Sequence, residues 1–158
     1  MTVWQKRSRA SSIETTGSRK CASRRTSAYP SIQPGHRCCT GDYIAFLDHD
    51  DLLEPGTLFE YVSAINSDAE IDLLYCDEDK LFPNGTYGDP YFKPDFSPHL
   101  LREVNYICHF LMIRSSLLAR LEPADPTFDG AQDHRMILQA VEKAREYAIY
   151  PTFCTIGA

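Results

Sequence analysis

The sequence lacks the features that mark a membrane-spanning or a secreted protein. No apolar run approaches the roughly 20 residues of a membrane-spanning helix, and no apolar core of a signal peptide is present. The six cysteines include no C-x-x-C pair. Their spacing argues against a zinc site and against a disulfide framework. We therefore expect a reduced, cytoplasmic protein.

Acidic residues are nearly missing from residues 1–40, where Glu14 stands beside eight of the 16 Lys and Arg residues. This segment is rich in Ser, Thr and Arg and has no periodicity, which is typical of a disordered chain. Residues 41–158 contain the other 21 of the 22 acidic residues, an excess that disfavours nonspecific binding of nucleic acid. We therefore expect a basic segment, 1–40, one folded domain, 41–158, and no nucleic-acid partner. A transit peptide and a nucleic-acid arm are the weaker interpretations of the basic segment.

Short apolar segments alternate with helical patterns in the folded part. Residues 43–47, 71–75 and 106–113 are predicted strands, because they are apolar or aromatic and end at polar residues. Residues 56–66 are predicted to form a helix, and "FDGAQDHRMILQAVEKA" is predicted to form a turn followed by a helix with Asp133 near its start. Between them, residues 83–98 are predicted to form a long loop with a hairpin at Asn84 and Gly85. The alternation predicts an α/β fold.

Three aspartates, Asp48, Asp50 and Asp51, follow directly after the predicted strand 43–47. Open α/β sheets bind ligands at the carboxyl ends of their strands. Two aspartates separated by one residue can share Mg²⁺ or Mn²⁺ with the oxygens of a diphosphate. The alternative is a solvated acidic turn that caps the next helix. An EF-hand loop is excluded, because Leu53 and Phe59 stand where that loop needs Gly and Glu.

Five motifs resemble one protein family in the same order along the chain. They are "YIAFLDHDDLLEPGTL", "DLLYCDEDK", "PYFKPDFSPHLL", "NYICHFLMIR" and "FDGAQDHRMILQAVEKA", which together cover about residues 41–147. They resemble the family 2 glycosyltransferases, above all the bacterial enzymes that build O-antigen and rhamnan-type polysaccharides. Haloacid-dehalogenase-type phosphatases also have a D-x-D after an apolar strand. Their motif continues with a small residue and Thr or Val, whereas Leu52 and Leu53 follow Asp51 here.

The resemblance implies a GT-A fold with a mixed, mostly parallel sheet flanked by helices. It implies inverting transfer from a UDP- or dTDP-sugar to a saccharide or lipid-linked saccharide acceptor in surface polysaccharide synthesis. A peripheral place on the inner face of the membrane is then an alternative to a purely cytoplasmic one.

The resemblance also assigns roles by position. Asp48 and Asp50 would hold Mn²⁺ or Mg²⁺ on the donor diphosphate, with Asp51 beside them. Asp133 in "GAQDH" would be the base that removes the proton from the acceptor hydroxyl, with a helix cap as the alternative. The residues implied on the donor-sugar and acceptor side are Asp77, Glu78, Asp79, Lys93, Asp95 and His109. Loop capping and solvated charge are the alternatives for this last group.

Three departures from the family pattern suggest an incomplete GT-A domain. Nothing in residues 1–40 resembles the family's base-binding strand, and Arg135 stands where relatives usually have Asp. The closing "PTFCTIGA" also differs from the family's "PxVLYHWR". The codons CCG ACG TTT TGT ACC ATT GGC would spell residues 151–157, and a G added after ACG in such a sequence would make it spell Pro-Thr-Val-Leu-Tyr-His-Trp. We therefore hypothesise a frameshift near Thr152 and a second one near Cys39, with a non-catalytic or truncated remnant as the alternative to an active enzyme.

Overall fold

The computed structural model describes residues 2–6, 40–48, 51–108, 110–123 and 125–157. Seven strands in these ranges form one sheet in the order β1-β2-β6-β4-β7-β3, and β5 pairs with β4 outside this path. The strands are β1 (Thr2–Lys6), β2 (Tyr43–Leu47), β3 (Leu52–Leu53), β4 (Ile71–Leu81), β5 (Tyr87–Tyr91), β6 (Leu111–Arg114) and β7 (Glu146–Gly157). The helices are α2 (Thr57–Ser67), α3 (Pro98–Glu103), α4 (Ser115–Leu118), the 3-10 helix η1 (Pro126–Phe128) and α5 (Gln132–Lys143).

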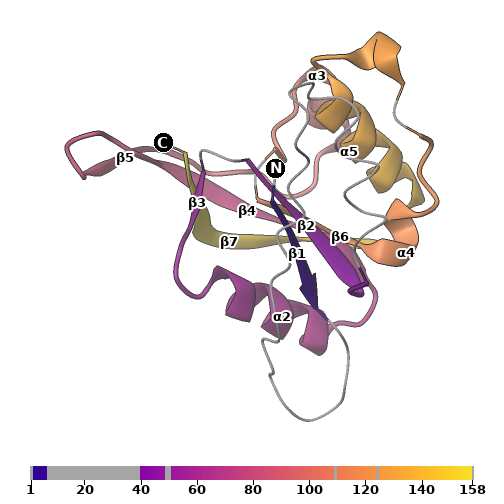
Figure 1. Cartoon of the computed structure of the whole chain (residues 1–158), viewed down its shortest axis with the longest axis horizontal. Helices are drawn as coiled ribbons and strands as arrows, with labels where there is room; N and C mark the ends of the chain where they lie inside the picture. Colours follow the sequence, from indigo (N-terminus) through magenta and orange to yellow (C-terminus); the bar gives the residue numbers. More distant parts are fainter. Residues whose placement is uncertain (1, 7–39, 49–50, 109, 124, 158) are drawn as a thin grey trace.

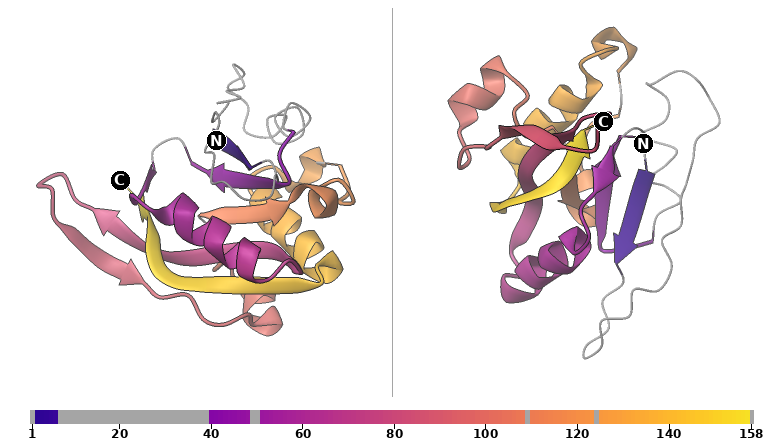
Figure 2. Two further views of the ribbon diagram at one scale, coloured as in Figure 1. Left: turned by 90° about the horizontal axis from the view of Figure 1, so that it is seen from below. Right: turned by 90° about the vertical axis from the view of Figure 1, so that its left-hand side faces the viewer.

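The sheet is buried on both faces. Helix α2 lies against one face, and α3 and α5 lie on the other side (Figure 1 and Figure 2). Side chains of a strand alternate between the faces, so Ile44 and Phe46 of β2 join the core that α5 covers. Tyr43, Ala45 and Leu47 join the core that α2 covers. This packing explains why β2 is a continuous apolar run that is buried along its whole length.

The expected mixed α/β sheet with flanking helices is confirmed, but the prediction of a mostly parallel sheet is wrong. Only the β4–β7 pair is parallel in the described part of the chain. The reason is the position of β6. Strands β2, β4 and β7 point in the same direction, as the strand–helix alternation suggests. However, β6 is inserted between β2 and β4 and runs antiparallel to both.

The predicted elements agree with the structure to different degrees. The strand 43–47 is confirmed, and helix α2 runs over Thr57–Ser67 against the predicted 56–66. Gly85, with a φ of 81°, lies in the turn between β4 and β5, which confirms the predicted hairpin. The predicted strand 106–113 is shortened to Leu111–Arg114, because Cys108 has a φ of 37° and cannot continue an extended strand. Residues 1–40 lie mostly outside the described ranges, and their described part, β1, pairs antiparallel with β2.

Candidate active site

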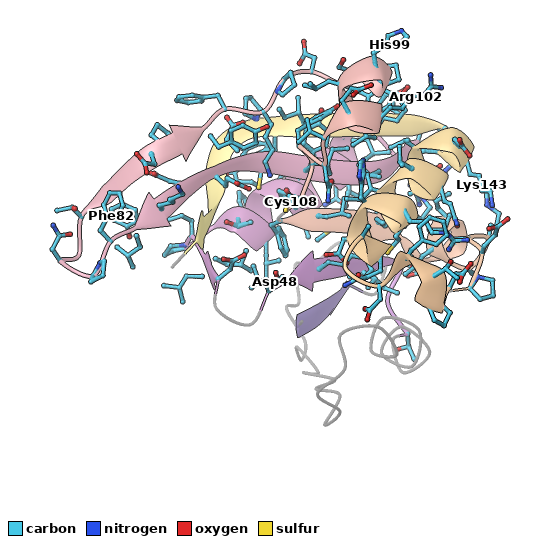
Figure 3. All side chains as sticks on the ribbon, turned by 90° about the horizontal axis from the view of Figure 1, so that it is seen from above. Asp48, Phe82, His99, Arg102, Cys108 and Lys143 are labelled. Carbon is cyan, nitrogen blue, oxygen red and sulfur yellow. The ribbon has the colours of Figure 1, made fainter. Side chains whose placement is uncertain are left out.

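Three segments of the sheet meet at one edge. Because β2 and β4 point the same way with β6 between them, their carboxyl ends flank the residues that lead into β6. Asp48 follows the last residue of β2 and is half-buried. Asp77 and Glu78 lie in the distal half of β4. Figure 3 labels Asp48 and Cys108 in this region of the molecule.

Asp48 and Asp51 are described between β2 and β3. The backbone N–H of Asp51 donates to the carbonyl oxygen of Asp48 over 3.4 Å, so the backbones of the two aspartates lie close together. Asp51 is half-buried. Asp50, the other implied metal ligand, lies outside the described residues, as does His49. Gly56, with a φ of 101°, then occupies the N-cap position of α2.

The second acidic cluster is joined to the "KPD" loop. Asp77 is buried, and its Oδ1 accepts a hydrogen bond of 2.8 Å from the backbone N–H of Lys93. The Lys93 ammonium lies 2.9 Å from Glu78 Oε2 and donates to the Ile107 carbonyl oxygen over 2.8 Å. Its side chain is 0% exposed. The structure therefore brings together Asp77, Glu78 and Lys93, which the sequence analysis had placed on the donor-sugar and acceptor side.

The other residues implied on the donor-sugar and acceptor side are less closely associated with Asp77, Glu78 and Lys93. Asp79 Oδ1 accepts a hydrogen bond from the backbone N–H of Lys80, and Asp95 is exposed in the loop before α3. His109 lies outside the described residues. Tyr91 is the partner of Glu78 in the β4–β5 register. Burial, with a further contribution from Glu78, raises the pKa of Tyr91, so its hydroxyl stays a hydrogen-bond donor near neutral pH.

Asp133 is the second residue of α5. The N-cap position of this helix belongs to Ala131, so Asp133 is not the N-cap residue, although it lies in the first turn. A carboxylate there is favoured by the positive end of the helix dipole. The first turn of α5 lies beside α3, because the next residue, His134, is hydrogen-bonded to Leu101.

Two neighbours of Asp133 fix this turn of α5. His134 Nε2 is hydrogen-bonded to the carbonyl oxygen of Leu101 in α3. The carbonyl can only accept, so the Nε2 atom carries the proton. Arg135 donates to Glu122 Oε2 over 2.8 Å and lies over the Phe128 ring, 4.9 Å from its centroid. These contacts attach α5 to α3 and to the segment before η1. These roles were not predictable from local sequence patterns, because the contacts join residues 7 to 33 positions apart.

The donor atoms at the edge suit a hard divalent cation. Carboxylate oxygens are the ligands that Mg²⁺ and Mn²⁺ prefer, and a diphosphate and water supply much of their coordination. Among the described residues, no three His, Cys, Asp or Glu side chains form a group that could hold a metal alone. The carboxylate of Asp48 fits such a cation.

The described structure thus defines an α/β protein with carboxylates gathered at the carboxyl edge of a mixed sheet. The family model described as Glycosyl transferase family 2 matches residues 24–121, which is more than half of the chain. The chain therefore belongs to glycosyl transferase family 2. This match begins at residue 24, inside the segment 1–40 in which the sequence analysis found no family motif.

Two curated bacterial proteins are similar to the chain. The O-antigen biosynthesis protein RfbC of Myxococcus xanthus is 44% identical over 108 residues, which are 68% of this chain and 8% of that protein. The uncharacterized protein y4gI of Sinorhizobium fredii (strain NBRC 101917 / NGR234) is 39% identical over 110 residues, or 70% of this chain and 12% of that protein. The chain therefore spans about a tenth of the length of these relatives.

No helix in the described ranges combines the length and the apolar character needed to cross a bilayer. The longest described helix, α5, has 12 residues and a polar face.

Proposed function

We propose that the chain carries the metal and acceptor side of an inverting, metal-dependent glycosyltransferase domain of GT-A fold. The donor would be a UDP- or dTDP-sugar, and the acceptor a saccharide or lipid-linked saccharide of a surface polysaccharide. The single observation that supports this most is the position of Asp48 at the carboxyl edge of the sheet in a chain of glycosyl transferase family 2. The printed function of the similar O-antigen biosynthesis protein supports a polysaccharide product.

Asp48 and Asp50 would hold Mn²⁺ or Mg²⁺, with Asp51 hydrogen-bonded to Asp48 through the backbone. When bound, the cation neutralises negative charge on the departing nucleoside diphosphate. The carboxylates of this protein then have a binding role, because they fix the diphosphate at the edge where the donor sugar can meet the acceptor.

Asp133 would act as the general base. Its carboxylate takes the proton from the acceptor hydroxyl while that oxygen attacks the anomeric carbon and the bond to the nucleoside diphosphate breaks. One base is sufficient, because direct inversion needs no covalent intermediate. Membership in glycosyl transferase family 2 argues against the phosphatase alternative.

The role of Asp133 is tested by the variant Asp133→Asn. We expect transfer from the accepted UDP- or dTDP-sugar to fall by about 10²–10⁴-fold, while nucleotide affinity stays nearly unchanged, because the base acts only in the chemical step. Glu142→Gln, an exposed position on the same helix, is the matched control and should retain full transfer. Full transfer by Asp133→Asn would contradict the assignment. A wild-type chain that binds nucleotide but transfers no sugar would favour the non-catalytic remnant.

A further inference from the structure

Lys93 is a buried cation, whereas Lys80 and Lys143 are exposed. Lysine is rarely buried unless its ammonium is paired, because removing the charge from water is costly. Here the ammonium contacts Glu78 Oε2 at 2.9 Å and donates to the Ile107 carbonyl oxygen at 2.8 Å. The side chain is fully covered, so its charge is directed into the protein and not toward a ligand.

The same residue is also held through its backbone. Its N–H donates to Asp77 Oδ1 over 2.8 Å. We name Asp77, Glu78, Lys93 and the Ile107 carbonyl the Lys93 clamp. It joins three segments that are distant in sequence: the distal half of β4, the loop before α3, and the residues leading into β6. Tyr75 adds a neighbouring contact, because its hydroxyl donates to the Pro94 carbonyl oxygen over 2.9 Å.

The Ile107 carbonyl is the contact that matters for the active site. The next residue, Cys108, has a φ of 37°, a conformation that non-glycine residues adopt only when their surroundings impose it. Two residues further, the Phe110 carbonyl accepts a hydrogen bond of 2.9 Å from the Tyr61 hydroxyl. The chain between these anchors leads into β6, which lies between the carboxyl ends of β2 and β4.

Glu78 has an uneven environment. Its Oε2 atom is buried and accepts no hydrogen bond from the described residues, although the Lys93 ammonium lies 2.9 Å away. The attraction between Lys93 and Glu78 is therefore electrostatic, and it requires the Lys93 side chain to stay positively charged. Removal of the cation would leave a buried carboxylate oxygen without compensation.

From these contacts we infer that Lys93 is a positioning residue, which holds the Ile107–Cys108 backbone in place beside the carboxyl edge. It acts through that backbone and not by touching substrate. This inference reassigns Lys93 from the donor-sugar and acceptor side of the site, and only its kinetic consequence rests on the proposed function.

The first test measures the backbone directly. In Lys93→Met, amide hydrogen exchange in peptides covering residues 105–113 should accelerate at least about tenfold, because the segment has lost its anchor. The matched control is Asp72→Asn, which removes a buried ionic contact at the opposite end of β4. At equal global stability, the control should leave exchange in this segment unchanged. Equal exchange in Lys93→Met and Asp72→Asn would overturn the inference.

A double variant separates the anchor from the unpaired charge. The double variant Lys93→Met/Glu78→Gln removes both the Lys93 ammonium and the Glu78 carboxylate. No buried carboxylate is therefore left without its cation. We expect global stability to recover while exchange in residues 105–113 stays fast, because the Ile107 carbonyl still lacks its donor. Restored slow exchange in the double variant would mean that only the charge mattered and would overturn the inference. The double variant also provides the measurement if Lys93→Met does not fold.

The kinetic test distinguishes positioning from a purely structural role. With the nucleotide sugar that the wild type accepts, kcat of the double variant should fall about 10–100-fold while KM changes less than about threefold, since small displacements at an active site reduce the chemical rate. Unchanged kcat with accelerated exchange would contradict the positioning role. If the wild type transfers no sugar, the proposed function fails, and the exchange measurements still decide whether Lys93 holds the backbone.

Discussion

At the scale of single residues, the best-defined ionic contacts lie at the edge of the sheet opposite the candidate site. Asp72, at the start of β4, is 1% exposed. Its Oδ1 accepts from Arg114 Nε at 2.7 Å, and its Oδ2 accepts from the backbone N–H of Arg145 at 3.0 Å. Burial alone would raise the pKa of Asp72, but the hydrogen bonds from Arg145 and Arg114 outweigh it and lower the pKa to about 2. These contacts tie β4, β6 and the start of β7 together.

Because the pKa of Asp72 is lowered in the folded protein, the free energy of unfolding depends on pH. A carboxylate with a folded-state pKa below its ordinary value stabilises the fold above that ordinary value, and this contribution disappears as the pH falls through the folded-state pKa. For a shift from 3.8 to about 2, the contribution is about 2 kcal/mol at neutral pH. We expect Asp72→Asn to lower the free energy of unfolding by about this amount at pH 7 and to remove the corresponding loss between pH 4 and 2.

Urea denaturation at several pH values provides the measurement. Asp89→Asn is a suitable control, because the Asp89 carboxylate forms only an exposed ion pair of 3.4 Å with Lys80, and such pairs contribute little. Parallel pH profiles for the wild type and Asp72→Asn would show that Asp72 is not responsible.

At the scale of elements, β7 changes its pairing along its length. From Ile71 opposite Glu146 to Cys76 opposite Tyr150 its pairing with β4 is close to regular, with one irregularity near the start. Next, Asp77 pairs with Phe153 and Glu78 with Thr155, so β7 contains extra residues relative to β4. The irregularity begins at Pro151, which lacks a backbone N–H for the ladder. It coincides with the position at which the sequence departs from the family pattern.

We propose that this departure is a change of reading frame near Thr152, with a second change near Cys39. Fresh sequencing of the gene and its upstream flank should reveal an added G close to the Thr152 codon. The restored frame should continue with Val-Leu-Tyr-His-Trp. A confirmed nucleotide sequence that encodes all 158 residues as written, with no hidden coding frame upstream, would refute the proposal.

The sequence predicted β2, α2 and α5 well, because β2 is a continuous apolar run and the two helices have apolar residues at helical spacing. The alternation of strands and helices predicted the α/β class. The sequence could not predict that β6 would lie between β2 and β4, because this order depends on contacts between residues far apart in sequence. For the site, the sequence indicated Asp48 and Asp133 through local motifs. The burial of Lys93 was not predictable, because it depends on Glu78 and Ile107, which are distant along the chain.

At the scale of the whole molecule, the two edges of the sheet have different roles. The edge with Asp72, Arg114 and Arg145 neutralises its charges internally. The opposite edge gathers Asp48, Asp51 and the end of β4, so negative charge accumulates where a cation and a diphosphate could bind. The central property proposed for this protein is therefore that the second edge binds a nucleoside diphosphate through a divalent cation.

Titration calorimetry with UDP and with dTDP, each with and without Mn²⁺, tests this claim most directly. We predict that Mn²⁺ raises the affinity of the wild type for at least one of the two nucleotides by about tenfold or more, which is about 1.4 kcal/mol. Asp48→Asn should abolish the enhancement. Asp42→Asn, at the other end of the same strand, should retain it. Equal affinity with and without Mn²⁺ for both nucleotides in the wild type would contradict the proposed metal and diphosphate site.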